Sequence, residues 1–383
     1  MHASIRFGRV GGVEIGAHWT WLLIFGLFVW SLGGAVFPSE NPGLSDATYA
    51  VMAVVAAVLF FASLVLHELG HATTARREGM EIEGITLWVF GGVAKFKGMF
   101  PSAGAEFRIA IAGPLVSLVI GGSLVALGEL VHLPTAVDGV VTWLGRINLI
   151  LLAFNMLPAL PLDGGRVLRS LIWRSTGDFT TATRIAGALG QGFGRVMIAG
   201  GIALALLAGA PGGLWFALIG WFLTTAAGAE ASLATMREAL AGLTVADAMA
   251  AGPVVAQAEA SLATFVGEVF ARSRHAAYPV ITADGTVVGL LSFKDVGAVP
   301  PDAWERTTVR DVARPLEDTL VVAPGDSLGD VAIELTQTSP GRALVLDGDR
   351  LAGLLSITDV SRLLELHRQG RAPPRPTPSV RAA

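Results

Sequence analysis

The chain has 383 residues, of which 52% are hydrophobic and only 15% charged, and its mean hydropathy is +0.61. An ordinary soluble domain carries about 25% charged residues, so this composition is that of a membrane protein. The net charge of -4 gives no case for nucleic-acid binding. Because the chain has no cysteine, it has neither a disulfide framework nor a thiolate metal site, and any metal must be held by His, Asp or Glu.

Six segments approach the length of about 20 apolar residues that a helix needs to cross a bilayer. They cover residues 17–37, 49–71, 109–131, 140–157, 196–210 and 214–229. Lys and Arg gather before the first segment, between the second and third, and between the fourth and fifth, whereas the connections near residues 38–46, 132–139 and 211–213 have none. Since cytoplasmic loops carry the positive charge, we expect a multi-pass cell-membrane protein with both termini in the cytoplasm.

Residues 82–93, between the second and third apolar segments, alternate in polarity and are rich in Gly and β-branched residues. This pattern predicts a short strand or hairpin, with a plain interfacial loop as the alternative. At membrane depth, open backbone of this kind is tolerated only where protein or a cavity covers it.

From about residue 243 the composition changes to that of a soluble α/β protein with an internal repeat. The run Gly-Leu-Leu-Ser-Phe-Lys-Asp at 289–295 recurs as Gly-Leu-Leu-Ser-Ile-Thr-Asp at 353–359. We therefore expect an α-helical polytopic membrane domain followed by a cytoplasmic α/β pair of repeats. The predicted boundaries are 1–230 for the membrane domain, 231–242 for a helical linker, 243–300 and 301–366 for the repeats, and 367–383 for a disordered, proline-containing tail.

Residues 49–66 contain no charged side chain and lead directly into His67, Glu68 and His71. On a helix, residues four apart share a face, so the two histidines can hold one zinc ion. Glu68 is placed to take a proton from a zinc-bound water. The alternative is a pair of structural histidines beside a stray acid, but ionisable groups at membrane depth are costly and usually functional. The pattern favours a hydrolytic zinc site within the membrane.

Catalytic zinc usually has three protein ligands, and Asp163 is the candidate for the third. Pro158 and Pro161 break the fourth apolar segment just before it and can turn its carboxylate toward the second segment. Alternatively, Asp163 caps a helix that begins at Gly164. Asn155, polar within an apolar run, either donates to the oxyanion of a tetrahedral intermediate or forms a hydrogen bond between helices.

The run His-Glu-Leu-Gly-His at 67–71, together with Asn-Met-Leu-Pro-Ala-Leu-Pro-Leu-Asp-Gly at 155–164, resembles the site-2 protease family of intramembrane zinc metalloproteases. The runs Gly-Gly-Val-Ala at 91–94 and Ala-Gly-Pro-Leu-Val-Ser at 112–117 are similar to two further family motifs, and the likeness covers roughly the first 230 residues. The resemblance implies one Zn2+ held by His67, His71 and Asp163, with Glu68 as general base. Ser117 stands where the family commonly carries Asn.

Residues 243–366 resemble a tandem of cystathionine-β-synthase (CBS) domains. In that family the Asp of a Ser/Thr-x-x-Asp motif bonds a nucleotide ribose, since vicinal hydroxyls suit a carboxylate acceptor. The resemblance thus implies an adenine nucleotide held by Ser292 with Asp295 and by Ser356 with Asp359. The alternative is a dimerisation module whose Asp residues cap helices. Paired tandem domains make a homodimer the expected assembly.

Three functions remain open at this point. The leading one is an intramembrane zinc metalloprotease that cleaves a transmembrane protein within or near its membrane segment, by regulated intramembrane proteolysis, under control of the CBS pair. A strand over residues 82–93 near the metal would offer its edge to an extended substrate. The second is a nucleotide-gated transporter or channel, which leaves Glu68 without a role and lacks a visible inverted repeat. The third is an idle scaffold, against which the complete set of ligand and base residues argues.

Overall fold

The computed structural model describes residues 4–89, 91–96, 98–210, 212–273, 275–337 and 341–368. The chain forms two compact units, Met1–Ala234 and Thr235–Ala383. From residue 369 onward, the tail that the sequence predicts to be disordered lies outside the described residues.

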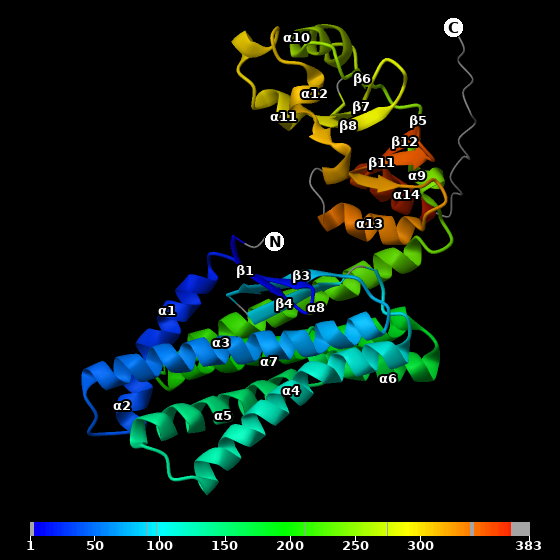
Figure 1. Cartoon of the computed structure of the whole chain (residues 1–383). Helices are drawn as coiled ribbons and strands as arrows, with labels where there is room; N and C mark the ends of the chain where they lie inside the picture. Colours follow the sequence, from blue (N-terminus) through cyan, green and yellow to red (C-terminus); the bar gives the residue numbers. More distant parts are fainter. Residues whose placement is uncertain are drawn as a thin grey trace. The chain divides into compact units, whose positions relative to one another are not determined.

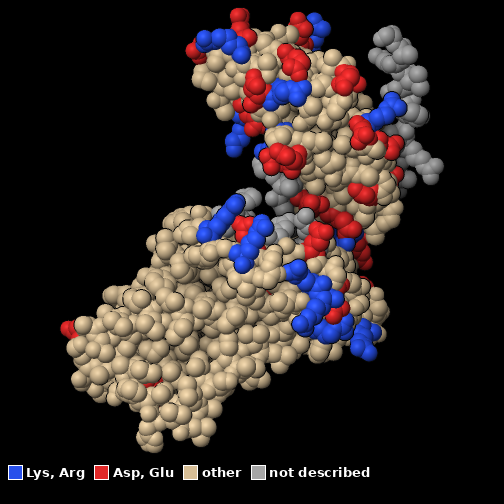
Figure 2. Space-filling model, in the orientation of Figure 1, with Lys and Arg blue, Asp and Glu red and all other residues tan. Residues whose placement is uncertain are grey.

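In the described part of the first unit and its continuation, six helices are long and apolar enough to cross a membrane, as predicted (Figure 1). The first, Trp21–Glu40, consists of α1 (Trp21–Ser31), the π-helical η1 (Leu32–Val36) and α2 (Phe37–Glu40). The others are α3 (Asp46–Arg77), α4 (Ala103–Leu130), α5 (Thr135–Asn155), α7 (Phe179–Leu207) and α8 (Gly213–Ala239). On the face shown in Figure 2, the Lys and Arg side chains of this unit lie along its upper edge and its right-hand side, and its lower left part has none.

The fifth span differs most from its prediction, because α7 begins at Phe179 rather than near residue 196. The Asp178 side chain caps this start by accepting from the Thr180 and Thr181 backbone N–H groups. Arg184 and Arg195 lie on the helix, so a search for uninterrupted apolar residues recognises only its second half. The predicted sixth span and linker helix form one continuous helix, α8.

Small residues bring these helices close together. A Cβ added at Gly70 of α3 would lie 3.0 Å from the Ala112 carbonyl oxygen of α4, and one at Gly220 of α8 would lie 2.5 Å from the Gly194 carbonyl oxygen of α7. Close backbone approach through small residues is typical of helices packed in membranes. A shorter helix, α6 (Asp163–Thr176), stands between α5 and α7 in the chain and ends at Gly177, whose φ of 74° suits glycine.

A four-stranded sheet, in the order β1-β2-β3-β4, packs on α3 through a cluster of Val13, Ile85 and Ala72. Its strands are β1 (Ile5–Val10), β2 (Val13–Ala17), β3 (Ile82–Trp88) and β4 (Gly91–Phe96). The antiparallel pair β3–β4 confirms the predicted hairpin, and β4 is an edge strand of the sheet. The pair β1–β2 was not predicted, because the side chains of β1 are largely exposed and give no alternation of apolar residues.

The second unit contains the two predicted repeats, each with its own hydrophobic core. The first repeat comprises α9 (Val245–Ala248), β5 (Ala250–Ala251), β6 (Ala256–Gln257), α10 (Leu262–Thr264), η2 (Phe265–Phe270), β7 (Ala277–Ile281), β8 (Val287–Ser292) and α11 (Phe293–Gly297), followed by the connecting turn η3 (Pro301–Ala303). The second comprises α12 (Val309–Val312), β9 (Arg314–Pro315), η4 (Leu316–Asp318), β10 (Leu320–Val322), α13 (Leu328–Gln337), β11 (Arg342–Asp347), β12 (Arg350–Ser356) and α14 (Ile357–Arg368).

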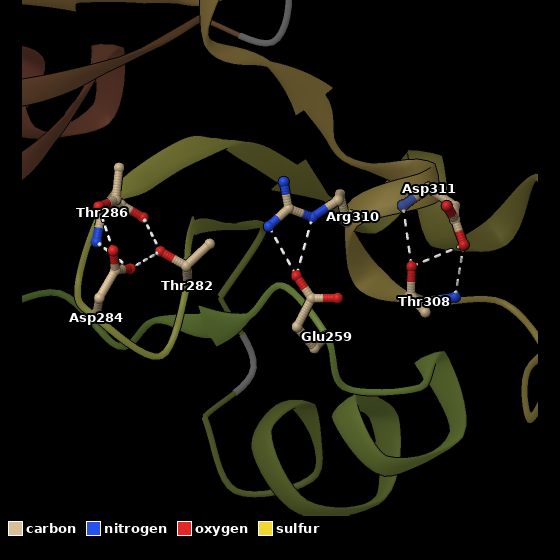
Figure 3. Close-up of polar contacts among 7 residues, drawn as sticks. All are labelled: Glu259, Thr282, Asp284, Thr286, Thr308, Arg310 and Asp311. Atoms are coloured by element: carbon tan, nitrogen blue, oxygen red, sulfur yellow. Dashed lines mark hydrogen bonds and ion pairs between the residues drawn. The ribbon is translucent and has the colours of Figure 1, made fainter.

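The two repeats exchange their first strands. The sheets have the orders β6-β7-β8-β9 and β10-β11-β12-β5, so β9 of the second repeat pairs with β8 and β5 of the first repeat pairs with β12. An ion pair of 2.7 Å between Glu259 and Arg310 supports the same exchange by joining the loop after β6 to α12 (Figure 3). The two sequence repeats are therefore not two independent sheets.

Candidate metal centre

Helix α3 presents His67 and His71 on one face, as the spacing predicts, and Ser45 starts this helix by accepting from the Thr48 backbone N–H. Both histidines are buried, with 2% and 7% of their surfaces exposed. The interior of α3 is otherwise apolar, so two buried imidazoles there require polar partners. Those partners come from α4 and α6.

Asp163 of α6 lies against both imidazoles. Its Oδ2 atom is 3.2 Å from His67 Nε2, its Oδ1 atom is 3.3 Å from His71 Nε2, and the two Nε2 atoms are 3.2 Å apart. Ligands held about 2.0–2.1 Å from a tetrahedral zinc lie about 3.3 Å from one another. The two Nε2 atoms have this spacing, and each of them has a different carboxylate oxygen of Asp163 at a similar distance. With one ligand atom from each residue, all within 4.8 Å of one another, the set can supply three corners of a zinc site and leave the fourth for water or substrate.

The outer nitrogens of both imidazoles have partners that orient the inner ones. His71 Nδ1 donates to the Ile109 carbonyl oxygen at 2.7 Å, so in the neutral ring Nε2 carries the free electron pair. His67 Nδ1 lies 2.9 Å from the hydroxyl oxygen of Ser117, which is fully buried. Ile109 and Ser117 both belong to α4. Partners of this kind fix the tautomer and orientation of metal-binding histidines.

Gly113 of α4 allows the two histidine side chains to approach the backbone of that helix closely. A Cβ added there would lie 2.2 Å from His71 Nε2 and 2.6 Å from His67 Nε2. No side chain is compatible with these distances. Gly113 thus lets both imidazoles lie directly against the α4 backbone where the metal-binding atoms converge.

Asp163 is the first residue of α6, and its side chain makes no capping bond, so the alternative role as a helix cap is not what the structure shows. The start of α6 is held by close backbone contacts. A Cβ at Gly164 would lie 2.3 Å from the Met156 carbonyl oxygen, and one at Gly165 would lie 2.3 Å from the Leu160 backbone nitrogen. A negative side chain is also favoured at a helix N-terminus.

Glu68 is half-buried and lies against the edge strand β4. A Cβ added at Gly92 of this strand would lie 2.6 Å from Glu68 Cγ and 3.2 Å from its Oε1 atom. The glycine therefore lets the strand pass directly beside the carboxylate.

Asn155, the remaining predicted site residue of this unit, is the last residue of α5 and is half-buried. Within the described residues its side chain makes no hydrogen bond, so the structure does not support a bond between helices. Nor does it record a contact between Asn155 and the three metal-binding candidates.

The predicted nucleotide residues of the second unit form helix caps. Asp295 Oδ2 accepts from the backbone N–H and the hydroxyl of Ser292, and Asp359 makes the same pair of bonds to Ser356. Thr308 and Asp311 form an equivalent capping box at the start of α12 (Figure 3). Each of these carboxylates uses Oδ2 for the cap.

Sequence reasoning missed the supporting roles of Ser117 and Gly113. A serine in an apolar helix ordinarily bonds to its own helix backbone, and a glycine in a transmembrane segment ordinarily serves helix packing. The only signal was their place in the run at 112–117, which resembles a family motif but does not itself reveal a contact with the histidines.

A buried two-histidine, one-carboxylate set with an adjoining glutamate, in a unit of six long apolar helices, defines the class of membrane zinc metalloproteases. The sequence profile of peptidase family M50 matches residues 55–137 and 131–197, and that of the CBS domain matches 245–297 and 309–366. The Mycobacterium tuberculosis protein Rip3, whose name assigns it to the zinc metalloproteases, is 38% identical over 381 residues, which cover 98% of this chain and 96% of Rip3. The chain belongs to peptidase family M50, the site-2 proteases, and carries a tandem pair of CBS domains.

A curated sequence and a solved structure from Methanocaldococcus jannaschii are also similar. Zinc metalloprotease MJ0392 is 28% identical over 366 residues, which cover 96% of this chain and 97% of the relative. The solved structure of a site-2 protease from the same organism is 31% identical, covers 59% of this chain and 94% of its own, and has a TM-score of 0.43. Of the three functions left open by the sequence, family membership supports the zinc metalloprotease.

Proposed function

We propose that this chain is an intramembrane endopeptidase that hydrolyses a peptide bond within or near a transmembrane segment of another membrane protein. The observation that carries the proposal is the buried set of His67, His71 and Asp163, with Glu68 beside it, in a unit built of long apolar helices. Desolvated ionisable groups in such a setting are costly, and a catalytic metal site accounts for all four.

In this proposal His67 Nε2, His71 Nε2 and one carboxylate oxygen of Asp163 hold a single zinc ion. When bound, the zinc supplies a Lewis acid that polarises the scissile carbonyl and brings the pKa of its water toward about 7. Glu68 accepts the proton of the attacking water and passes it to the leaving amine. Asn155, whose amide has no intramolecular partner within the described residues, donates to the oxyanion that develops on the substrate.

The substrate is proposed to bind as an extended strand. β4 is an edge strand of its sheet, and Gly92 brings it directly beside Glu68. A substrate helix that unwinds near a helix-breaking residue would expose backbone groups that pair with this edge. Such pairing would hold the scissile bond next to the proposed base.

The charge distribution supports a membrane orientation with both termini in the cytoplasm, because stretches that contain several Lys and Arg alternate along the chain with connections that contain none. His67 and His71 lie in the second half of α3, so the metal centre would be closer to the cytoplasmic surface. We propose that the cytoplasmic CBS pair is the site of regulation, acting as a sensor and as the interface of a homodimer.

For the CBS pair we propose an adenine nucleotide as ligand, with Ser292, Asp295, Ser356 and Asp359 as its ribose contacts. In the described residues, Oδ1 of each Asp has no hydrogen-bond partner, so each cap leaves one oxygen available to hydroxyl groups. Titration of the purified protein with AMP and ATP tests this. Heat of binding that disappears in Asp295→Ala and Asp359→Ala supports the proposal, and equal heat in all three proteins contradicts it.

The peptidase proposal is tested by comparing membranes from cells that produce the wild type or Glu68→Gln. Mass spectrometry of new peptide termini should find cleavage in or near transmembrane segments with the wild type alone, while both proteins contain equal zinc. Glutamine keeps the shape of the side chain but cannot accept the proton. The same new termini in both samples would exclude Glu68 as the base.

A further inference from the structure

A buried group of three charged side chains lies outside the metal centre and joins three helices. Arg169 of α6 donates through Nε and Nη2 to Glu106 Oε1 of α4, at 2.7 and 2.5 Å. It also donates through Nη1 to Glu230 Oε1 of α8 at 2.6 Å. The Arg169 and Glu106 side chains are 3% and 0% exposed, and that of Glu230 is 26% exposed. We call this group the α6 ion triad.

Stability alone is a poor explanation for the α6 ion triad. Burying charges costs free energy that their mutual attraction often fails to recover, and apolar residues of similar size frequently serve stability as well. The second oxygen of Glu106 is buried and, within the described residues, has no hydrogen-bond partner. What a guanidinium fork between two carboxylates does provide is a fixed geometry. Arg169 is further confined by the Phe179 ring, whose centroid lies 4.9 Å from its Cζ atom.

The α6 ion triad holds α6, which carries Asp163, against α4, whose groups orient both histidines. Asp163 is the first residue of α6, and Arg169 follows within two turns, about 9 Å along the helix. Glu106 belongs to α4, the helix whose Ile109 carbonyl and Ser117 hydroxyl orient His71 and His67. A shift of α6 against α4 would therefore separate Asp163 from the two imidazoles.

Glu230, the third residue of the α6 ion triad, connects α6 to a helix that continues into the second unit. Glu230 lies on α8, which runs from Gly213 to Ala239 and crosses the boundary at Ala234. Within the second unit, Arg237 of the same helix pairs with Asp330 of α13. The same helix thus forms an ion pair with α6 through Glu230 and, about two turns later, an ion pair with α13 through Arg237.

We propose that Arg169 is a positioning residue for Asp163, and that Glu230 is the group through which α8 influences that position. This inference rests on the proposed function, because it assumes that Asp163 binds the metal. In this inference, the α6 ion triad couples the position of α8 to the geometry of the metal centre.

The test uses the full-length protein in detergent, with zinc affinity and the visible absorption of the Co2+-substituted protein as readouts. Arg169→Met should weaken zinc binding by about tenfold, the lower end of what outer partners of metal ligands contribute, and should alter the Co2+ spectrum. Arg169→Lys, which keeps the charge but not the fork, should fall between Arg169→Met and wild type. Arg108→Met is the matched control, because Arg108 of α4 pairs with Glu78 in an exposed position; it should resemble wild type in both readouts.

If Arg169→Met does not fold, Glu230→Gln decides, because it leaves the Arg169–Glu106 pair in place. It should change the Co2+ spectrum and weaken zinc binding by a few-fold. Wild-type spectra and affinity in Glu230→Gln, and in Arg169→Met where it folds, would overturn the inference. A folded wild type that binds no metal would instead overturn the proposed function, so the two failures are distinguishable.

Discussion

At the scale of single residues, Ser117 and Gly113 illustrate how the metal centre depends on groups that bind no metal. Ser117 lies 2.9 Å from His67 Nδ1, and a Cβ at Gly113 would lie within 2.6 Å of both Nε2 atoms. The sequence predicts His67, Glu68, His71 and Asp163 because their chemistry is visible in their spacing and side chains. It cannot predict Ser117 or Gly113 in the same way, because their roles arise from the packing of α4 against α3.

Ser117→Ala should weaken zinc binding by about 10- to 100-fold, because His67 loses the hydrogen-bond partner that orients its ring. Competition with a chromogenic chelator measures the change. Ser63→Ala is the control, since Ser63 is equally buried on α3 but its hydroxyl donates to the Phe60 carbonyl of its own helix. Equal zinc affinity in the two variants would contradict the role assigned to Ser117.

Gly113→Ala should abolish zinc binding in a protein that still folds, because the new methyl group would occupy the space where the two Nε2 atoms converge. Metal analysis and size-exclusion chromatography measure the two properties. Gly122→Ala, on the same helix with no atom within 4 Å of the added Cβ, should bind zinc as the wild type does. Zinc retained at wild-type affinity in Gly113→Ala would show that the metal does not lie between the two Nε2 atoms and Gly113.

At the scale of elements, prediction succeeded where periodicity is strong and failed where other signals dominate. The apolar runs of α3 and α4 and the hairpin of β3 and β4 were recognisable from hydrophobicity and alternation. The first half of α7 was missed because Arg184 and Gln191 interrupt its apolar run, although Asp178 caps it well. In the second unit, capping boxes mark the starts of short helices.

The capping box of α12 should make part of the stability of the CBS unit sensitive to acid. Hydrogen bonds from the Thr308 hydroxyl and backbone N–H lower the pKa of Asp311. A depressed carboxyl pKa adds stability above the unfolded-state value, about 3.9, and that stability is lost as pH falls through the folded-state value. The melting temperature of Thr308→Ala should therefore lie below that of wild type near neutral pH, by a margin that narrows below about pH 4.

Thr319→Ala is the control for this measurement, because the Thr319 hydroxyl donates to the Pro315 carbonyl and bonds no acid. The difference in melting temperature between Thr319→Ala and wild type should not change with pH. A margin for Thr308→Ala that stays constant down to about pH 3 would show that the Thr308–Asp311 bonds do not favour the charged carboxyl.

At the scale of the whole molecule, the order of domains was predictable and the way the repeats join was not. Composition separates an apolar unit from an α/β unit, and the duplicated Gly-Leu-Leu-Ser run identifies the repeat. The exchange of β5 and β9 between sheets depends on strands of only two residues, which are too short to leave a periodic pattern. Helix α8 is likewise continuous from Gly213 to Ala239, although the sequence predicts a separate span and linker, because the hydropathy changes along its length.

The measurement that tests the central claim most directly is the zinc content of the detergent-purified wild type beside Asp163→Ala and Glu68→Gln. We predict about one zinc per chain in the wild type and in Glu68→Gln, because a glutamate acting as base is not a ligand, and loss of zinc in Asp163→Ala, where one of three ligands is removed. A folded wild type without zinc, or full zinc occupancy in Asp163→Ala, would contradict the account.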